Sequence, residues 1–148
     1  MKNDTYTLKE LVEVLNDSKK FYEEASTKVD QPELQQLFTR MARTKGAIAS
    51  DLKTQITASG KKAPEGGTAG GSLRKAYGEV RAKLSSTPDR EYIAQLEDFE
   101  DRIVDAFRDA AAESEDSGVR ALATKYMPEV MRDHSQMSAL KQQMKHHS

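Results

Sequence analysis

The chain has 148 residues, a length that fits one domain with a single hydrophobic core. Its 23 Lys and Arg residues nearly balance its 24 Asp and Glu residues, which argues against nucleic acid as the main partner. Cysteine is absent, and this excludes disulfides, thiolate nucleophiles and zinc–thiolate sites. Residues 1–9 contain no apolar run with a cleavage site, and no window approaches the ~20 apolar residues of a membrane span, so we expect one cytoplasmic domain over residues 1–148.

Apolar residues recur at helical spacing through most of the chain, whereas strand-type alternation is hard to find. The pattern predicts four long helices at about residues 8–29, 33–58, 89–113 and 118–145. Only a short break separates the first two helices, so they should form an antiparallel hairpin. Pro128 lies inside the fourth helix, where it should remove one backbone hydrogen bond and bend the helix.

The connection between the second and third helices, residues 60–88, is long and changes composition abruptly. Residues 60–72 hold five of the chain's eight glycines, which is typical of a surface connection. Residues 72–84 recover a helical pattern and predict a short accessory helix with four basic side chains, Arg74, Lys75, Arg81 and Lys83. We expect this basic element to dock on the bundle or to present a surface to an acidic partner. The crossover lets the second and third helices run parallel, as in ferritin-like bundles.

Several stretches of the sequence are similar to a known family. They are residues 17–25, the crossover with residues 73–77, residues 96–101, and residues 127–130 followed by Asp133 and His134. Through these stretches the chain resembles a bacterial family of ferritin-like four-helix-bundle proteins whose function is unassigned. Periodicity and resemblance together predict an all-α fold, a ferritin-like four-helix bundle whose long crossover carries a short accessory helix. The shared motifs are mostly packing patterns, so they support the fold far more than an activity.

Catalytic ferritin-like proteins direct one Glu from each of two helices, and a Glu-x-x-His from each of the other two, towards a central metal site. At ~100° per residue, the inward positions in the first helix of this chain are Ser18 and Tyr22, whereas Asp17 points nearly opposite. The second helix places Thr44 and Lys45 there and contains no histidine. Neither helix therefore supplies an evident metal ligand.

The third and fourth helices contribute the remaining candidate ligands. Glu100 lies at the edge of the inner stripe of the third helix, and Asp133 and His134 lie on the inner stripe of the fourth, with Glu129 facing away. A mononuclear site of the two-histidine-one-carboxylate kind would need a second histidine. We expect no cofactor, and iron or manganese held by Glu100, Asp133 and His134 is the alternative.

The leading interpretation is that the Lys45 ammonium supplies the positive charge that iron would supply. Each buried charge is costly unless it is paired, so Lys45 should either pair with Glu100 or Asp133 or extend outward to solvent. We expect the following interior polar cluster: Ser18, Tyr22, Thr44, Lys45, Glu100, Asp133 and His134.

Three classes of function stay open. The leading class is a non-enzymatic bundle without catalytic residues, in a stress-associated or protein-interaction role. The second is a metal-binding or oxidative protein that uses the two carboxylates and the histidine named above. The third is a carrier of a small apolar ligand in a cavity lined by Met41, Ile103 and Val130. The expected partner is a second copy of the chain or another protein, and neither nucleic acid nor a membrane.

Overall fold

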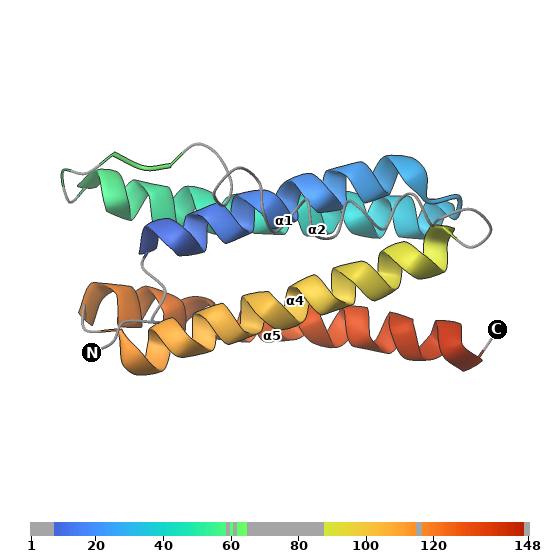
Figure 1. The fold of residues 1–148 in the computed structure, drawn as a ribbon. Helices are drawn as coiled ribbons and strands as arrows, with labels where there is room; N and C mark the ends of the chain where they lie inside the picture. The colour runs from blue at the N-terminus through green and yellow to red at the C-terminus, as the bar shows by residue number, and fades with distance from the viewer. Residues whose placement is uncertain (1–7, 59, 61, 65–87, 115–116, 147–148) are drawn as a thin grey trace.

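The computed structural model describes residues 8–58, 60, 62–64, 88–114 and 117–146. These residues form four helices: α1 (Leu8–Lys28), α2 (Pro32–Ala58), α4 (Pro88–Glu113) and α5 (Ser117–His146). Each bound lies within one residue of the bound that periodicity predicts. The predicted all-α four-helix bundle is confirmed (Figure 1). The accessory helix expected at 72–84 lies outside the described residues.

The helix ends follow from local sequence. Pro32 begins α2, in the first turn, where its missing N–H costs little. Gly60 has a positive φ of 84°, the left-handed conformation in which glycine commonly ends a helix. The carboxylate of Asp89, in the first turn of α4, accepts hydrogen bonds from the backbone N–H groups of Asp30 at 2.8 Å and Gln31 at 3.2 Å. The start of α4 is therefore tied to the turn between α1 and α2.

The four helices form two antiparallel hairpins. α1 packs along α2 and α4 packs along α5, whereas the contacts between hairpins, α1 with α4 and α2 with α5, are less extensive. α2 and α4 run in the same direction (Figure 1), as the long crossover predicts. One polar tie between the hairpins is the carboxylate of Asp51 in α2, which accepts a hydrogen bond from the Tyr126 hydroxyl in α5.

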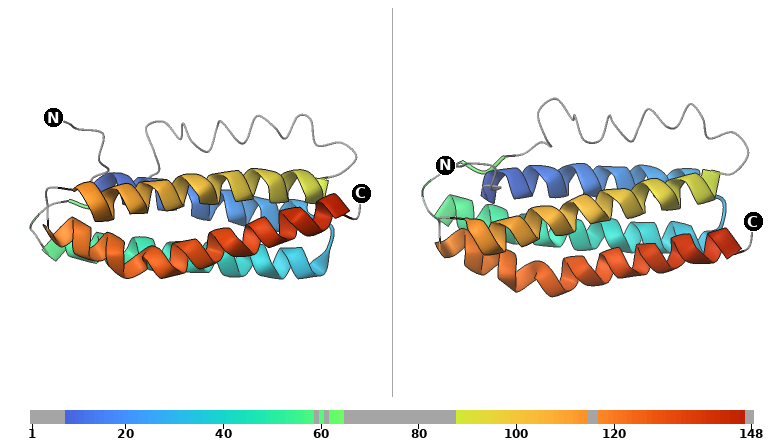
Figure 2. Two further views of the ribbon diagram at one scale, coloured as in Figure 1. Left: turned by 90° about the horizontal axis from the view of Figure 1, so that it is seen from below. Right: turned by 60° about the horizontal axis from the view of Figure 1, so that its bottom comes forward.

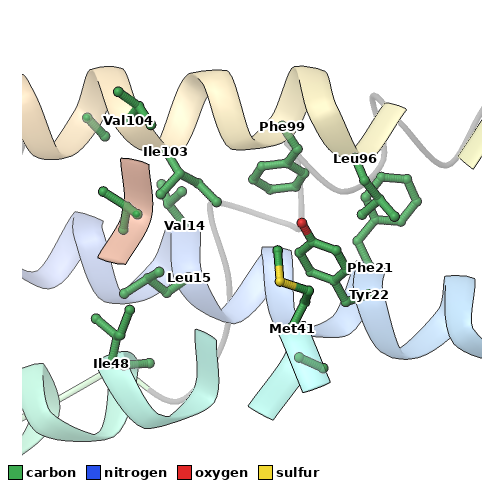
Figure 3. Packing of buried hydrophobic residues seen from close by; sticks show 14 of the residues in the cluster. Val14, Leu15, Phe21, Tyr22, Met41, Ile48, Leu96, Phe99, Ile103 and Val104 are labelled. Atoms are coloured by element: carbon green, nitrogen blue, oxygen red, sulfur yellow. The ribbon is translucent and has the colours of Figure 1, made fainter. Parts of the chain in front are cut away.

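The apolar stripes of all four helices meet in one core (Figure 3). Aromatic rings join α1 to its neighbours. The ring centroid of Phe21 lies 6.1 Å from that of Tyr92 and 6.2 Å from that of Phe99, both in α4, and the Tyr22 centroid lies 5.9 Å from that of Phe38 in α2. Such tilted pairs are the arrangement that aromatic rings prefer.

α5 continues through Pro128 and is bent rather than broken (Figure 2), as the sequence predicts. Pro128 is exposed, so solvent can satisfy the carbonyl that loses its backbone donor. No helix in the described part of the chain has the length and apolar character needed to cross a membrane.

We expect Ile103→Ala to lower the free energy of unfolding by about 2–5 kcal/mol, because Ile103 is fully buried in the core and truncation leaves a cavity. Urea denaturation monitored by circular dichroism measures the change. Met131→Ala is the matched control: Met131 is 47% exposed, and its truncation should change stability by less than about 0.5 kcal/mol. Equal losses in the two variants would contradict the placement of the core.

Candidate functional site

A buried ion-pair network lies at the centre of the bundle, and all four helices contribute to it. Lys45 sits on the inner stripe of α2 between Met41 and Ile48, and its side chain is 0% exposed. Its Nζ lies 2.8 Å from Oε1 of Glu100 in α4 and 2.9 Å from Oδ2 of Asp133 in α5. The lysine therefore does not extend outward to solvent. The sequence predicted a pair with Glu100 or with Asp133, and in the structure Lys45 pairs with both.

α1 contributes a hydroxyl to this network. The Tyr22 side chain points from α1 towards α4 (Figure 3), and its hydroxyl donates a hydrogen bond to Oε2 of Glu100. Glu100 thus accepts from Lys45 on one oxygen and from Tyr22 on the other. Burial, followed by the charge of Glu100, raises the pKa of Tyr22 well above its usual value of 10. Tyr22 consequently stays a neutral donor.

Burial and charge oppose each other at the ion pair itself. Burial disfavours the ammonium and lowers the pKa of Lys45, but the charges of Glu100 and Asp133 raise it, and the net shift is upward. Burial first, and the charge of Asp133 in addition, raise the pKa of Glu100, whereas Lys45 and Tyr22 lower it, and the net shift is upward. The pKa values of Tyr22, Lys45 and Glu100 are therefore all shifted upward.

Glu129 extends the network towards the surface, although sequence reasoning places this residue facing away. Its side chain is half-buried, and burial together with a hydrogen bond to Asp133 raises its pKa. Its Oε1 also lies 2.7 Å from an Arg132 guanidinium nitrogen. Glu129 and Asp133 are four residues apart in α5 and hence share one side of the helix, which is the signal that could have revealed this contact.

The structure does not bring Thr44 into the cluster. Thr44 is half-buried, and its hydroxyl donates to the Arg40 carbonyl oxygen at 3.2 Å within α2. This local bond, from a threonine to the carbonyl four residues earlier, competes with any tertiary contact of the hydroxyl. Ser18 is buried as predicted, but its hydroxyl has no hydrogen-bond partner among the described residues.

His134 also lies apart from Lys45, on a half-exposed seam between α4 and α5. Its Nε2 is 3.4 Å from both Oε2 of Glu97 and Oδ1 of Asp101, not beside Glu100 or Asp133. The physical reason is rotation: His134 follows Asp133 by one residue and points ~100° away from it. Sequence reasoning missed Glu97 and Asp101, whose spacing of four residues on α4 is the available signal.

Glu97 accepts two hydrogen bonds at the same seam. They come from the Ser138 hydroxyl at 3.0 Å and from the Lys141 ammonium at 3.4 Å. Both donors follow His134 on the same side of α5, at four and seven residues. This seam joins α4 to α5 and is separate from the Lys45 network.

The residues at the centre do not fit a di-iron site. The Lys45 ammonium occupies the space between the two carboxylates that would serve as ligands, and His134 of the described helices lies at a different place, beside Glu97 and Asp101. Within the described ranges, no group of three or more His, Asp or Glu side chains has an arrangement that could hold a metal ion. Lys45, Glu100 and Asp133 are also no more than 5% exposed, so a substrate would meet them only if the bundle opened.

We expect Lys45→Met to lower the free energy of unfolding by about 3 kcal/mol or more, because it leaves buried carboxylates without their cation. Thermal and urea denaturation measure the effect. Lys125→Met is a matched control, since the Lys125 side chain is 62% exposed and its ion pair with Asp51 is worth about 1 kcal/mol at most. A melting curve of the Lys45 variant that matches wild type would contradict the buried pair.

We expect stability to fall as pH rises above about 10, because folded Lys45 and folded Tyr22 keep protons that the unfolded chain releases there. Each group contributes up to about 1.4 kcal/mol per pH unit while only the unfolded state is deprotonated. Urea midpoints between about pH 8 and about pH 11 measure the slope. Tyr22→Phe should flatten it, and a slope identical in the two proteins would remove Tyr22 from the explanation.

No curated protein and no solved structure matches the chain. A family model, described as Domain of unknown function (DUF2383), matches residues 4–113, which is well over half of the chain. The matched part contains α1, α2 and α4, and with them Tyr22, Lys45 and Glu100, whereas Asp133 lies beyond it. By this match the chain belongs to the DUF2383 family of domains of unknown function.

Proposed function

We propose that this protein is a non-enzymatic ferritin-like bundle in which an ion pair takes the place of the metal, and that it serves in a stress-associated or protein-interaction role. The observation that carries the proposal is the Lys45 ammonium held between Glu100 and Asp133. An ammonium there supplies fixed positive charge without offering a coordination position, so the site can stabilise one helix arrangement but cannot cycle electrons or bind oxygen species.

The ferritin-like part of the proposal rests on topology. α2 and α4 run in the same direction and are joined by a long connection, whereas an up-down-up-down bundle has short loops throughout. The polar groups also come from facing helices at one level, which is where ferritin-like proteins place their ligands. This arrangement supports a scaffold shared with metal-binding bundles and a centre with a different composition.

The two alternative functions have less support. A metal site of Glu100, Asp133 and His134 would need the imidazole at the centre, but His134 faces Glu97 and Asp101. For a carrier of apolar ligands, the residues proposed to line the cavity are packed inside the core: Met41, Ile103 and Val130 are each at most 2% exposed.

A hollow of about 370 Å³ lies instead on the outer side of α2. It is lined by five residues whose side chains end in polar or charged groups: Gln35, Gln36, Thr39, Arg40 and Arg43. An apolar ligand would offer no partner to these amide, hydroxyl and guanidinium groups, so this hollow does not favour the carrier function.

Metal loading tests the proposal. Protein purified without chelator is incubated with iron(II) or manganese(II), passed through a desalting column and subjected to elemental analysis, and iron oxidation is followed in parallel. We expect substoichiometric metal and an oxidation rate equal to that of buffer. Stoichiometric metal in wild type that is lost in both Glu100→Gln and His134→Ala would instead establish the metal-binding alternative. In the structure these two side chains belong to two separate polar contacts, so only a metal bound by both would be lost in both variants.

A further inference from the structure

The hollow on the outer side of α2 brings together amide, hydroxyl and guanidinium groups. Its volume of about 370 Å³ lies within the range of about 300–1,000 Å³ that is usual for small-molecule sites. The residues that line it follow two rows along the helix: Gln36, Arg40 and Arg43 in one, and Gln35 and Thr39 in the other. Among the residues that the structure describes, none of those lining the hollow is acidic. The hollow is therefore locally basic.

The two arginines of the hollow differ from three other arginines on the surface of the bundle. Arg102, Arg108 and Arg132 each form an ion pair with a carboxylate three or four residues earlier in the same helix. The side chains of Arg40 and Arg43 are exposed and make neither an ion pair nor a hydrogen bond within the described part of the chain. Two guanidinium groups thus face one hollow without an anionic partner from the described helices.

The sequence of α2 explains why these guanidinium groups find no partner within their own helix. Neighbours on a helix surface are three or four residues apart. The positions at those spacings hold no acidic residue: they are Gln36, Leu37, Arg43 and Thr44 around Arg40, and Thr39, Arg40, Gly46 and Ala47 around Arg43. The two arginines are instead each other's neighbours, and like charges that adjoin on a helix are mildly destabilising. A bound anion would remove this repulsion and pair both groups.

Hydrogen bonds within the α1–α2 hairpin hold the second row of the hollow in place. The Gln35 amide nitrogen donates to the Val29 carbonyl oxygen at 2.9 Å, and the Thr39 hydroxyl donates to the Gln35 carbonyl oxygen at 2.8 Å. The amide oxygen of Gln35 and the hydroxyl oxygen of Thr39 can therefore accept hydrogen bonds from a ligand. The hollow thus offers cationic donors along one row and neutral acceptors along the other, which suits an anionic group attached to a hydroxylated body.

The charge of the arginine pair favours a phosphate as the anionic group. A phosphate monoester carries about −1.5 to −2 charges at pH 7, which matches two guanidinium groups, whereas one carboxylate neutralises only one of them. Guanidinium groups also bind phosphate oxygens bidentately. We propose that the hollow binds a small phosphorylated sugar or polyol, with Arg40 and Arg43 on the phosphate and Gln35, Gln36 and Thr39 on the hydroxyl groups. This site shares no residue with the Lys45 network, so the proposal is independent of the function proposed above.

Isothermal titration calorimetry of the full-length protein with glucose 6-phosphate tests this site, with inorganic phosphate and glucose as comparison probes. We expect glucose 6-phosphate to bind at one site per chain and at least about fivefold more tightly than inorganic phosphate, because the sugar hydroxyls add hydrogen bonds. Glucose should give no binding heat. Arg40→Gln and Arg43→Gln should each weaken the binding of glucose 6-phosphate about tenfold or more, since each removes a charge-assisted contact.

Arg108→Gln is the matched control, because it removes the same charge from a side chain that is 60% exposed on α4, and it should leave binding unchanged. All three variants should keep the circular dichroism spectrum of wild type, since the substituted residues are exposed. The proposal is overturned if glucose 6-phosphate does not bind, if it binds no better than inorganic phosphate, or if Arg108→Gln weakens binding as much as the α2 variants do. Tighter binding of a hexaglutamate peptide would overturn it in favour of an acidic protein partner.

Discussion

One ammonium group holds the two halves of this bundle in register. Lys45 belongs to the α1–α2 hairpin, and both of its acceptors, Glu100 and Asp133, belong to the α4–α5 hairpin. The hairpins contact each other less than the helices within each hairpin do. Apolar packing tolerates small sliding of one hairpin over the other, but two charged bonds of 2.8 and 2.9 Å do not. The geometry of the pair therefore favours one relative position of the two hairpins, whatever its net contribution to stability.

The protonation of the network follows from its charge balance. One cation faces two buried carboxyl groups, and a third, that of Glu129, bonds to Asp133 closer to the surface. Upward pKa shifts at Glu100 and Glu129, which burial causes first, are the response expected when negative charge accumulates out of water. Tyr22 satisfies the remaining Glu100 oxygen without adding charge. The network thereby approaches neutrality without a metal ion.

Periodicity alone predicted the four helices, and the inward positions of Tyr22, Lys45, Glu100 and Asp133 followed from rotating ~100° per residue. The same rule failed at the margins of the apolar stripe. His134 and Thr44 sit one residue from a core position, so a small rotation decides whether they face the centre or a neighbouring seam. The burial of Asp17 was not predicted either, because its position on α1 is nearly opposite the apolar stripe.

The extent of the family match separates the network into two parts. Residues 4–113 contain Lys45, Glu100 and Tyr22, which form a self-sufficient unit of one cation, one carboxyl group and one neutral donor. Asp133, in α5, adds a second carboxylate to the same ammonium and with it an excess of negative charge. Closer to the surface, Asp133 is hydrogen-bonded to Glu129, and Glu129 is paired with the Arg132 guanidinium. Lys45 and Glu100 form a direct tie between α2 and α4 that does not involve α5. Asp133 adds a second polar tie, from α5 to the same ammonium, beside the extensive packing of α5 along α4.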